Sequence, residues 1–394
     1  MHWPPELSEG EVRQVVDLTC ELIRLPSVLG SEEACARRLL SAFRELGYDE
    51  VGLDEAGNVF GVIEGGAPGP VLLLDGHLDT VGVEPVERWQ TPPWSGVVRG
   101  GRILGRGASD MKGAVAAMAV GIAGLERACL RGRVVVSGSV GEETTEGTAL
   151  RPILDRFRPD AVIIGETTSL AVAVGGRGRA EYGLQVEGRA AHASSPELGV
   201  SAVVLMAEVI QTIQRLVPRE HALAGPGRWC VTDIISAPFP AQSMVPFRCR
   251  ATLERRLVPG ESREAVEGEL QQVLRRAGVR EYRLELNPVV YRTWTGVELR
   301  AEKWYPAWLM DPEDGFVKVA ARAVEELGIR CRKTAYRFCT NAAETAGVRG
   351  IPTIGFGPST EELAHVVDEW VAIEQLARAA AGYRAMAARF LGRP

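Results

Sequence analysis

This sequence lacks several features that by themselves would suggest where a protein works. Its seven cysteines form no CxxC pair and no regular framework, and such an odd set is typical of reduced thiols in a cytoplasm. The N-terminus shows no basic stretch followed by an apolar core, so we expect no signal peptide. The longest helix-like apolar run, Ala114 to Leu125, is shorter than the roughly 20 residues that a membrane span requires. We therefore expect a soluble, cytoplasmic protein with no membrane partner.

The sequence also has no excess of basic residues. Its formal net charge is −6, and its arginines are scattered among glutamates, whereas a nucleic-acid surface needs clustered Lys and Arg. No GxSxG motif is present, and GRGASDMKG lacks the Gly-Lys-Ser/Thr order of a phosphate-binding loop. These absences argue against nucleic acid as a partner, and against serine-nucleophile or phosphate-loop chemistry.

Strand and helix patterns alternate through the first part of the chain. Strands are expected at Val59–Glu64 and Val71–Asp75, and again in the runs RVVVSGSV and AVIIG, with helix-like patterns before and between them. Such alternation is typical of an α/β layer. The length of 394 residues favours two or three domains.

The pattern changes after Gly175. Two helix-like and four strand-like segments follow, which predicts a separate α+β sandwich. The α/β pattern resumes after about Trp294 and ends in a long helix. We therefore expect a discontinuous α/β domain made of residues 1–175 and 293–394, with residues 176–292 inserted as an α+β domain.

The segment VLLLDGHLDT contains the first residues with a chemical role. Its apolar run predicts a buried strand, and His77 and Asp79 leave that strand two residues apart. Because a carboxylate often holds the second ring nitrogen of a metal-binding histidine, we interpret His77 as a ligand and Asp79 as its orienting partner. Asp110 lies at a second loop-to-helix junction, after a Gly-rich turn, and its alternative role is that of a helix N-cap.

Further carboxylates follow the next strands. Glu142 and Glu143 come directly after RVVVSGSV, and Glu166 comes after AVIIG. Sites in open parallel sheets lie at the carboxyl ends of the strands, so we expect these side chains to crowd around His77. Buried carboxylates without partners are costly, and cations would hold them together. As an alternative, Glu142 and Glu143 form a solvated helix start.

Histidine is scarce in this sequence. Of five histidines, His2 lies close to the N-terminus and His221 lies in a loop pattern, which leaves His77, His192 and His365. His365 precedes a helix pattern in AHVVDEW, where a capping or surface role is the alternative. Two histidines with three or four carboxylates suit a pair of divalent metals about 3.5–4 Å apart, with one carboxylate bridging and another, unbound, handling protons.

The motifs GHLDT, WQTPPWSG, GRGASDMKG, GEE, GE and AHVVDE, in this order, resemble the M20 metallopeptidase family. That family contains acetylornithine deacetylases, succinyl-diaminopimelate desuccinylases, aminoacylases, carboxypeptidases and dipeptidases, and the match covers nearly the whole chain. The segments ERRLVPG, FCTN and GIPTIGFGP look most like a branch of hydrolases linked to selenium metabolism. The resemblance implies a zinc-peptidase-like α/β catalytic domain with an inserted ferredoxin-like domain that serves as lid and dimerisation domain.

The resemblance also implies roles for matching residues. Asp79 would orient His77, and Glu142 would be the general base for a metal-activated water that attacks an amide carbonyl. Two divalent ions are implied, zinc in the first place, with manganese or cobalt as alternatives. One ion would be held by His77, Asp110 and Glu166, and the other by Asp110, Glu143 and His365, with Asp110 bridging.

Three further residues are assigned by the resemblance. His192, in GRAAHAS, matches a histidine that in dimeric members reaches the active site of the partner subunit, so a homodimer is implied. Arg255 matches an arginine that holds a substrate carboxylate, with a surface ion pair as its alternative role. Asn341 lies in a segment that often lines the pocket and is the other expected substrate contact. A nucleophilic role for the nearby Cys339 is not expected, because it has no paired His motif.

These expectations together describe a two-metal hydrolase that cleaves the amide bond of N-acyl amino acids or small peptides. A strict di- or carboxypeptidase with the same site is the alternative among enzymes. A non-catalytic ligand-binding member of the fold is a further alternative. The presence of Glu142 argues against it, because a pure binder has no use for an uncoordinated carboxylate beside the water.

Overall fold

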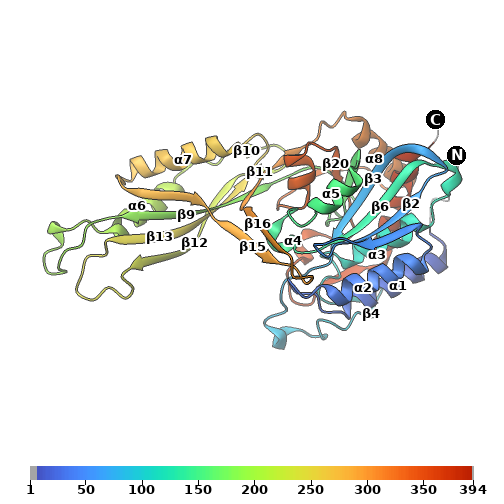
Figure 1. Cartoon of the computed structure of the whole chain (residues 1–394), viewed down its shortest axis with the longest axis horizontal. Coiled ribbons are helices and arrows are strands. Elements are labelled where there is room, and N and C mark those ends of the chain that lie inside the picture. The colour runs from blue at the N-terminus through green and yellow to red at the C-terminus, as the bar shows by residue number, and fades with distance from the viewer. Residues whose placement is uncertain (1–6, 393–394) are drawn as a thin grey trace.

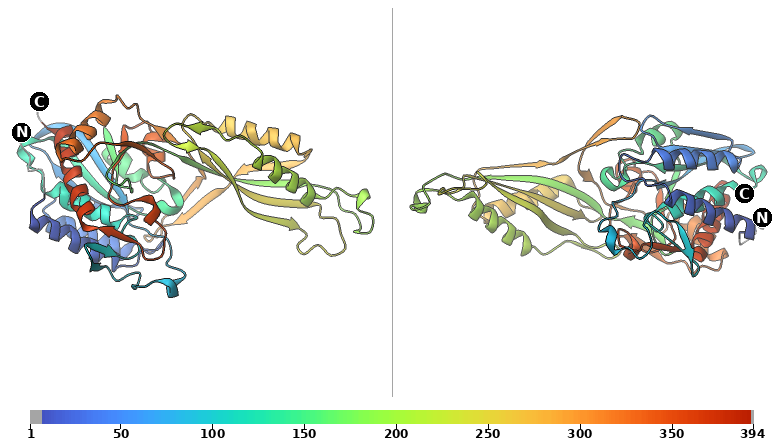
Figure 2. Two further views of the ribbon diagram at one scale, coloured as in Figure 1. Left: turned by 180° about the vertical axis from the view of Figure 1, so that it is seen from behind. Right: turned by 90° about the horizontal axis from the view of Figure 1, so that it is seen from below.

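The structure, a computed structural model, describes residues 7–392. Figure 1 shows an elongated molecule with two bodies, a larger one that contains the first and last helices and a smaller one built from the middle of the sequence. The two further views in Figure 2 show extended strands running from one body into the other. The expectations for the N-terminal leader and for His2 fall on residues 1–6 and lie outside the described residues.

The larger body is built around a mixed sheet. Its strands are β1 Glu50–Leu53, β2 Val59–Glu64, β3 Ala67–His77, β6 Arg131–Ser139, β7 Ala161–Ile164, β8 Val172–Gly176, β18 Trp308–Leu309, β19 Lys333–Tyr336 and β20 Thr353–Gly355. Within residues 7–392 they form a nine-stranded sheet in the order β1-β2-β6-β3-β7-β20-β8-β18, with β19 paired to β8. The central strands β6, β3, β7 and β20 run parallel. The expected α/β class is therefore confirmed.

Helices cover both faces of this sheet. Those on one face are α1 Glu9–Ile23, α2 Glu33–Glu45, α3 Lys112–Ala123, α8 Gly315–Glu326 and α9 Ile373–Leu391, and α5 Arg151–Phe157 lies on the other. Side chains alternate along β3, so Leu72 and Leu74 belong to the core under the five helices of one face, and Leu73 packs with α5 on the other face. Burial on both faces explains the continuous apolar run in this strand. None of the helices in the described chain is long and apolar enough to cross a membrane.

The smaller body is an antiparallel sheet of four long strands and the short β17 Trp304–Tyr305, with two helices on one face. Its strands are β9 Gly178–Glu187, β12 Arg228–Ala237, β13 Arg248–Leu257 and β14 Tyr282–Leu286, in the order β12-β13-β9-β14, and its helices are α6 Ala202–Gln214 and α7 Arg263–Arg276. Ser201 and Ser262 cap the two helices by accepting backbone N–H groups. This body contains the two helices and four strands that the sequence pattern indicates after Gly175. The short strand β17 pairs with β9 in the same sheet, and β10 Glu220–His221 and β11 Gly225–Pro226 form a separate pair.

A hairpin returns from the smaller body to the larger one. It consists of β15 Pro288–Arg292 and β16 Glu298–Glu302, and no sequence pattern predicts it. Figure 1 shows these two strands reaching the larger body beside the short helix α4 Glu142–Thr145. We propose residues 176–292 as the inserted domain, so that its second limit falls inside this hairpin.

The hairpin is anchored to the larger body at two levels. At its tip, Trp294 Nε1 donates to the carbonyl oxygen of Gly57 at 3.2 Å. In its first strand, the Tyr291 hydroxyl donates to Glu32 Oε1 at 2.6 Å. The Tyr291 ring also covers Gly141, where an added Cβ would lie 2.4 Å from a ring carbon. Gly141 has a φ of 65°, a conformation that favours glycine, and it immediately precedes Glu142. The hairpin therefore packs directly on the turn that carries this glutamate.

We predict that replacing Tyr291 weakens the whole structure. Tyr291 is 6% exposed, so Tyr291→Ala removes a buried ring and one of the two hydrogen bonds to Glu32 Oε1, at a cost of about 3 kcal/mol in the free energy of unfolding. Val290, its neighbour in β15, is 53% exposed, and Val290→Ala should cost less than about 0.5 kcal/mol. Urea unfolding of the two variants checks this. Equal losses of stability in Tyr291→Ala and Val290→Ala would show that Tyr291 does not anchor the hairpin to the larger body.

Candidate metal centre

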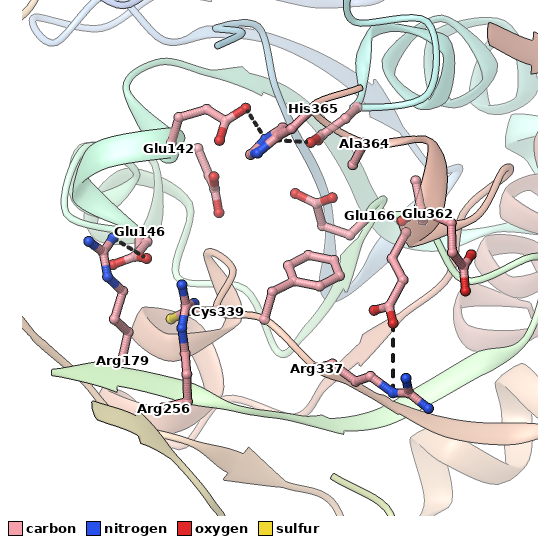
Figure 3. Close-up of a pocket in the computed structure, with 15 residues that line it drawn as sticks. Glu142, Glu146, Glu166, Arg179, Arg256, Arg337, Cys339, Glu362, Ala364 and His365 are labelled. Atoms are coloured by element: carbon pink, nitrogen blue, oxygen red, sulfur yellow. Dashed lines mark hydrogen bonds and ion pairs between the residues drawn. The ribbon is translucent and has the colours of Figure 1, made fainter. Parts of the chain in front are cut away.

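The candidate site lies where the parallel strands of the large sheet end. His77 is the last residue of β3, the short helix α4 Glu142–Thr145 follows β6, and Glu166 follows β7. The register places His77 opposite Ser139, the last residue of β6, so these side chains leave the sheet at one edge. Figure 3 shows Glu142, Glu166 and His365 around one side of a pocket at this edge.

Two groups of possible metal ligands share Asp110. His77 Nε2 lies 3.0 Å from Asp110 Oδ1 and 3.3 Å from Glu166 Oε1. His365 Nε2 lies 3.1 Å from Asp110 Oδ2 and 3.0 Å from Glu143 Oε1. Within each group the ligand atoms all lie within 4.8 Å of one another. Two imidazoles and three carboxylates arranged around a shared carboxylate are a donor set that fits a pair of divalent metals.

The pKa values of these ligands reflect their burial and their interactions with one another. Hydrogen bonds to Asp110 and Glu143 raise the pKa of His365 to about 10. Burial, together with the nearby Asp110 carboxylate, raises the pKa of Glu143 to about 7. Burial and Asp110 likewise raise the pKa of Glu166. Positive charge is therefore required at this site, and a metal ion that binds there must displace protons.

Asp79 supports the site in two ways. Its backbone carbonyl oxygen lies 2.9 Å from His77 Nδ1, which fixes the ring so that Nε2 faces the other ligands. Its carboxylate is 3.8 Å from Nδ1 and instead accepts the backbone N–H groups of Glu142 at 3.1 Å and Glu143 at 3.0 Å. Asp79 thus orients His77 mainly through its main chain, and its side chain holds the start of α4.

Glu142 lines the pocket but belongs to neither group of ligands. Its side chain is buried, and among the described residues its Oε1 has no hydrogen-bond partner. Burial raises the pKa of Glu142 well above its usual range. A buried carboxyl group beside a metal site, free of other partners, is placed to exchange a proton with a water molecule.

Asp110 is held by a residue to which the sequence motifs assign no role. The fully buried Glu369 carboxylate accepts the backbone N–H groups of Ser109 at 2.7 Å, Asp110 at 3.0 Å and Gly107 at 3.1 Å. Arg106 Nη1 donates to it at 2.6 Å. The Asp110 side chain does not cap α3, so its alternative role is not observed. Glu369 lies in the same AHVVDEW motif as His365, which is its only signal in the sequence.

Asn341 does not line the pocket, contrary to the expectation. Its Nδ2 donates to Asp75 Oδ2 at 2.7 Å and to Ser139 Oγ at 3.0 Å, and Ser137 Oγ donates to Asp75 Oδ1 at 2.6 Å. Asp75 lies in β3 two residues before His77, so this buried network holds together the ends of β3 and β6 behind the ligands. The Asn341 amide thus joins the two serine hydroxyls that donate to the buried Asp75 carboxylate, and it does not face the pocket.

The pocket in front of the ligands has a volume of about 520 Å³ and carries Arg179, Arg256 and Arg337 on its lining (Figure 3). Arg255, the expected substrate arginine, is not among them. Buried and less buried residues alternate along β13, and Arg255 lies on the buried face, where it forms an ion pair with Glu261. Arg256 lies on the opposite face, toward the pocket. In this structure Arg256 rather than Arg255 therefore faces the pocket, because the alternation of the strand decides which side chain faces the site.

His192 lies outside this pocket. It is exposed, its Nδ1 lies 2.7 Å from Ser194 Oγ, and its backbone bridges to Met244. The loop between β9 and α6 that contains it forms the end of the smaller body farthest from the large sheet in Figure 1. Within one copy of the chain, His192 therefore contributes nothing to the ligands or to the pocket lining.

Comparison with known proteins places the chain in a family. The model of peptidase family M20/M25/M40 matches residues 73–389. Uncharacterized protein YgeY of Escherichia coli (strain K12) is 31% identical over 379 residues, which cover 93% of this chain and 92% of that protein. Succinyl-diaminopimelate desuccinylase of Stenotrophomonas maltophilia (strain R551-3) is 28% identical over 393 residues, covering 96% and 99% of the two chains. The chain belongs to peptidase family M20/M25/M40.

Solved structures share its fold. Aminopeptidase PepT from Bacillus cereus ATCC 10987 has a TM-score of 0.75 at 22% identity, with 96% of this chain and 98% of that chain covered. Bacillus subtilis YXEP, a dinuclear metal binding peptidase from the M20 family, has a TM-score of 0.72 at 14% identity, with 98% and 99% covered. As a member of this family the chain is a hydrolase of amide bonds, and it carries candidate ligands for two metals.

We predict that Glu369 controls metal affinity without being a ligand. Glu369→Gln removes the negative charge that holds the Asp110 turn, so affinity for zinc should fall about 10- to 100-fold, as is typical when a group that orients a ligand is lost. Zinc titration against a competing chelator measures this. Asp368→Asn is the matched control, because Asp368 accepts the backbone N–H of Gln90 and does not bond to the Asp110 turn. Equal zinc affinity of Glu369→Gln and the unmodified protein would contradict the prediction.

Proposed function

We propose that this chain is a two-metal-dependent hydrolase that cleaves the amide bond of N-acyl amino acids or small peptides. The place of Glu142 carries the proposal. It is a buried carboxyl group with no ligand role, next to two groups of ligands that share Asp110. Family membership supports the same reaction class.

The ligand residues define what the metals would do. His77, Asp110 and Glu166 would hold one ion, and Glu143 and His365 would hold the other together with Asp110. Divalent ions in such a site act as Lewis acids and make water nucleophilic near neutral pH. We propose zinc for both positions, with manganese or cobalt as alternatives, because all three accept imidazole and carboxylate ligands.

Glu142 and Arg256 would act on the water and the substrate. Glu142 takes up a proton from the attacking water and delivers it to the nitrogen of the leaving amine. Its burial, which raises its pKa, favours this proton uptake. Arg256 would hold a substrate carboxylate with two parallel N–H groups. A cavity of about 520 Å³ between the ligands and this arginine suits a small substrate.

A strict di- or carboxypeptidase would use the same residues, since a dipeptide offers the same amide and carboxylate as an acyl amino acid. The desuccinylase relative, which aligns with nearly the whole chain, supports deacylation. The PepT structure supports the fold alone. A non-catalytic binder is disfavoured, because it would leave the buried Glu142 carboxyl without a purpose.

We further propose a homodimer formed through the smaller body. Its edge strand β12 exposes Ile234 and Ile235, and the adjacent helix α6 exposes Val204. An apolar edge strand is a surface that proteins usually pair or cover. In such a dimer His192 of one subunit would reach the pocket of the other and donate a hydrogen bond to the oxygen that becomes negative during the reaction.

The first test is release of free amine from N-acetyl, N-succinyl and N-carbamoyl amino acids and from dipeptides, with zinc, manganese or cobalt supplied. Faster cleavage of acyl amino acids would identify a deacylase, and preference for dipeptides a peptidase. Glu142→Ala should lower kcat at least about 100-fold while metal analysis still finds both ions. Glu362→Ala, which removes a carboxylate from the rim of the same pocket, is the control. Full activity of Glu142→Ala would disprove the role of Glu142.

The dimer proposal is tested by mixing two inactive variants. Glu142→Ala and His192→Ala should each be inactive alone, and refolding them together should restore part of the activity. Recovery is expected because a hybrid dimer contains one pocket with an intact Glu142 that receives the intact His192 of the other subunit. A monomer in sedimentation analysis, or no recovery in verified hybrids, would overturn the proposal.

A further inference from the structure

Glu146 occupies a backbone position that ordinary side chains avoid. It follows α4 directly, lines the same pocket as Glu142 and belongs to neither group of metal ligands. Its φ of 39° and ψ of 61° lie in the left-handed region, where glycine and asparagine are the usual residues. Strained positions of this kind are found at functional sites. The side chain at position 146 therefore calls for a functional explanation.

The Glu146 carboxyl group has one oxygen bound and one unused. Its side chain is buried, with 6% of the residue exposed, and Oε1 accepts from Arg179 Nη1 at 3.1 Å. Within residues 7–392 its Oε2 has no hydrogen-bond partner. Figure 3 shows Glu146 beside Arg179, with Arg256 next along the same wall of the pocket. Since a buried carboxylate oxygen without a donor is costly, this arrangement is completed when a donor enters the pocket.

The positive charge of Arg179 does not belong to Glu146 alone. Arg179 also contacts Glu254 at 3.1 Å and Glu181 at 3.4 Å, and Glu254 is shared with Arg256 at 2.9 Å. Burial raises the pKa of Glu146 to about 7, although Arg179 acts in the opposite direction. The carboxylate is therefore only partly neutralised by the protein, and a donor that brings positive charge suits it better than a neutral one.

We propose that Glu146 is a specificity-determining residue that accepts a hydrogen bond from a protonated amine of the substrate. The inference rests on the proposed hydrolase function and narrows its substrate class to N-acyl amino acids, or small peptides, whose side chain ends in an amine. Arg256 and Glu146 then form a complementary pair on one wall, one for the carboxylate and the other for the amine. A buried acceptor of this kind discriminates strongly, because a substrate without the amine leaves it unpaired.

The test compares two substrates that differ only in the terminal amine, Nα-acetyl-L-lysine and Nα-acetyl-L-norleucine, or the same residues in dipeptides with glycine. We expect kcat/KM of the unmodified enzyme to favour the lysine compound by about 10- to 100-fold, the range of a charge-assisted hydrogen bond. In Glu146→Gln this preference should fall to less than about 3-fold. Glu181→Gln is the matched control, because it withdraws a carboxylate from the same Arg179 outside the pocket lining and should keep the preference.

Several results would overturn the inference. An unmodified enzyme without preference for lysine, or one that prefers Nα-acetyl-L-glutamate, contradicts an amine at Glu146. Equal losses on both substrates in Glu146→Gln would make the Glu146 and Arg179 pair a contact that only holds the two bodies together. If no amide substrate is cleaved, the proposed function fails, and ligand binding decides this inference separately. Free L-lysine should then raise the Tm of the unmodified protein more than L-norleucine does, and Glu146→Gln should abolish that difference.

Discussion

The crowding of carboxyl groups at one edge of the large sheet is the constraint on which the rest of the structure depends. Asp110, Glu143 and Glu166 approach two imidazoles within hydrogen-bonding distance, the buried His77 and the half-exposed His365 at the pocket. Such a cluster is stable only with cations or protons between its members. Much of the surrounding structure supplies donors for this edge, from the backbone N–H groups on Glu369 to the amide of Asn341 on Asp75.

Both bodies contact the turn of α4, which carries Glu142 and Glu146. Asp79 holds its first N–H groups from the large sheet, and the Tyr291 ring of the hairpin covers Gly141 at its start. At its end, Arg179 from the strand β9 of the smaller body binds Glu146. The general base and the proposed specificity residue therefore sit on one short turn that both bodies hold. The position of the smaller body is in this way linked to the geometry of Glu142 as well as to the shape of the pocket.

The fold class and the ligand cluster could be predicted because their signals are local. The apolar run before His77 gives a buried strand, and a polar residue at the end of a parallel strand must emerge at the common edge. The hairpin of β15 and β16 could not be predicted in this way, because its strands are short and its contacts, such as that of Trp294 with Gly57, join residues far apart in the sequence. Arg255 and Asn341 were predicted as substrate contacts from motifs alone. A motif does not determine which face of a strand or turn is directed toward the site.

Sequence alone determined that His77, Glu142, Glu143 and Glu166 follow strands and so emerge at one edge of the sheet, because the apolar runs before them are local signals. The division of these residues into ligands and base, and the place of Asp110 among the ligands, came from the motifs of the family. Only the tertiary structure decided which neighbouring side chains serve them. Strand alternation and long-range packing put Arg256 rather than Arg255 in the pocket, placed Glu369 under Asp110, and left one oxygen of Glu146 without a partner. These outcomes depend on contacts between segments that are distant in the chain, and no local pattern encodes them.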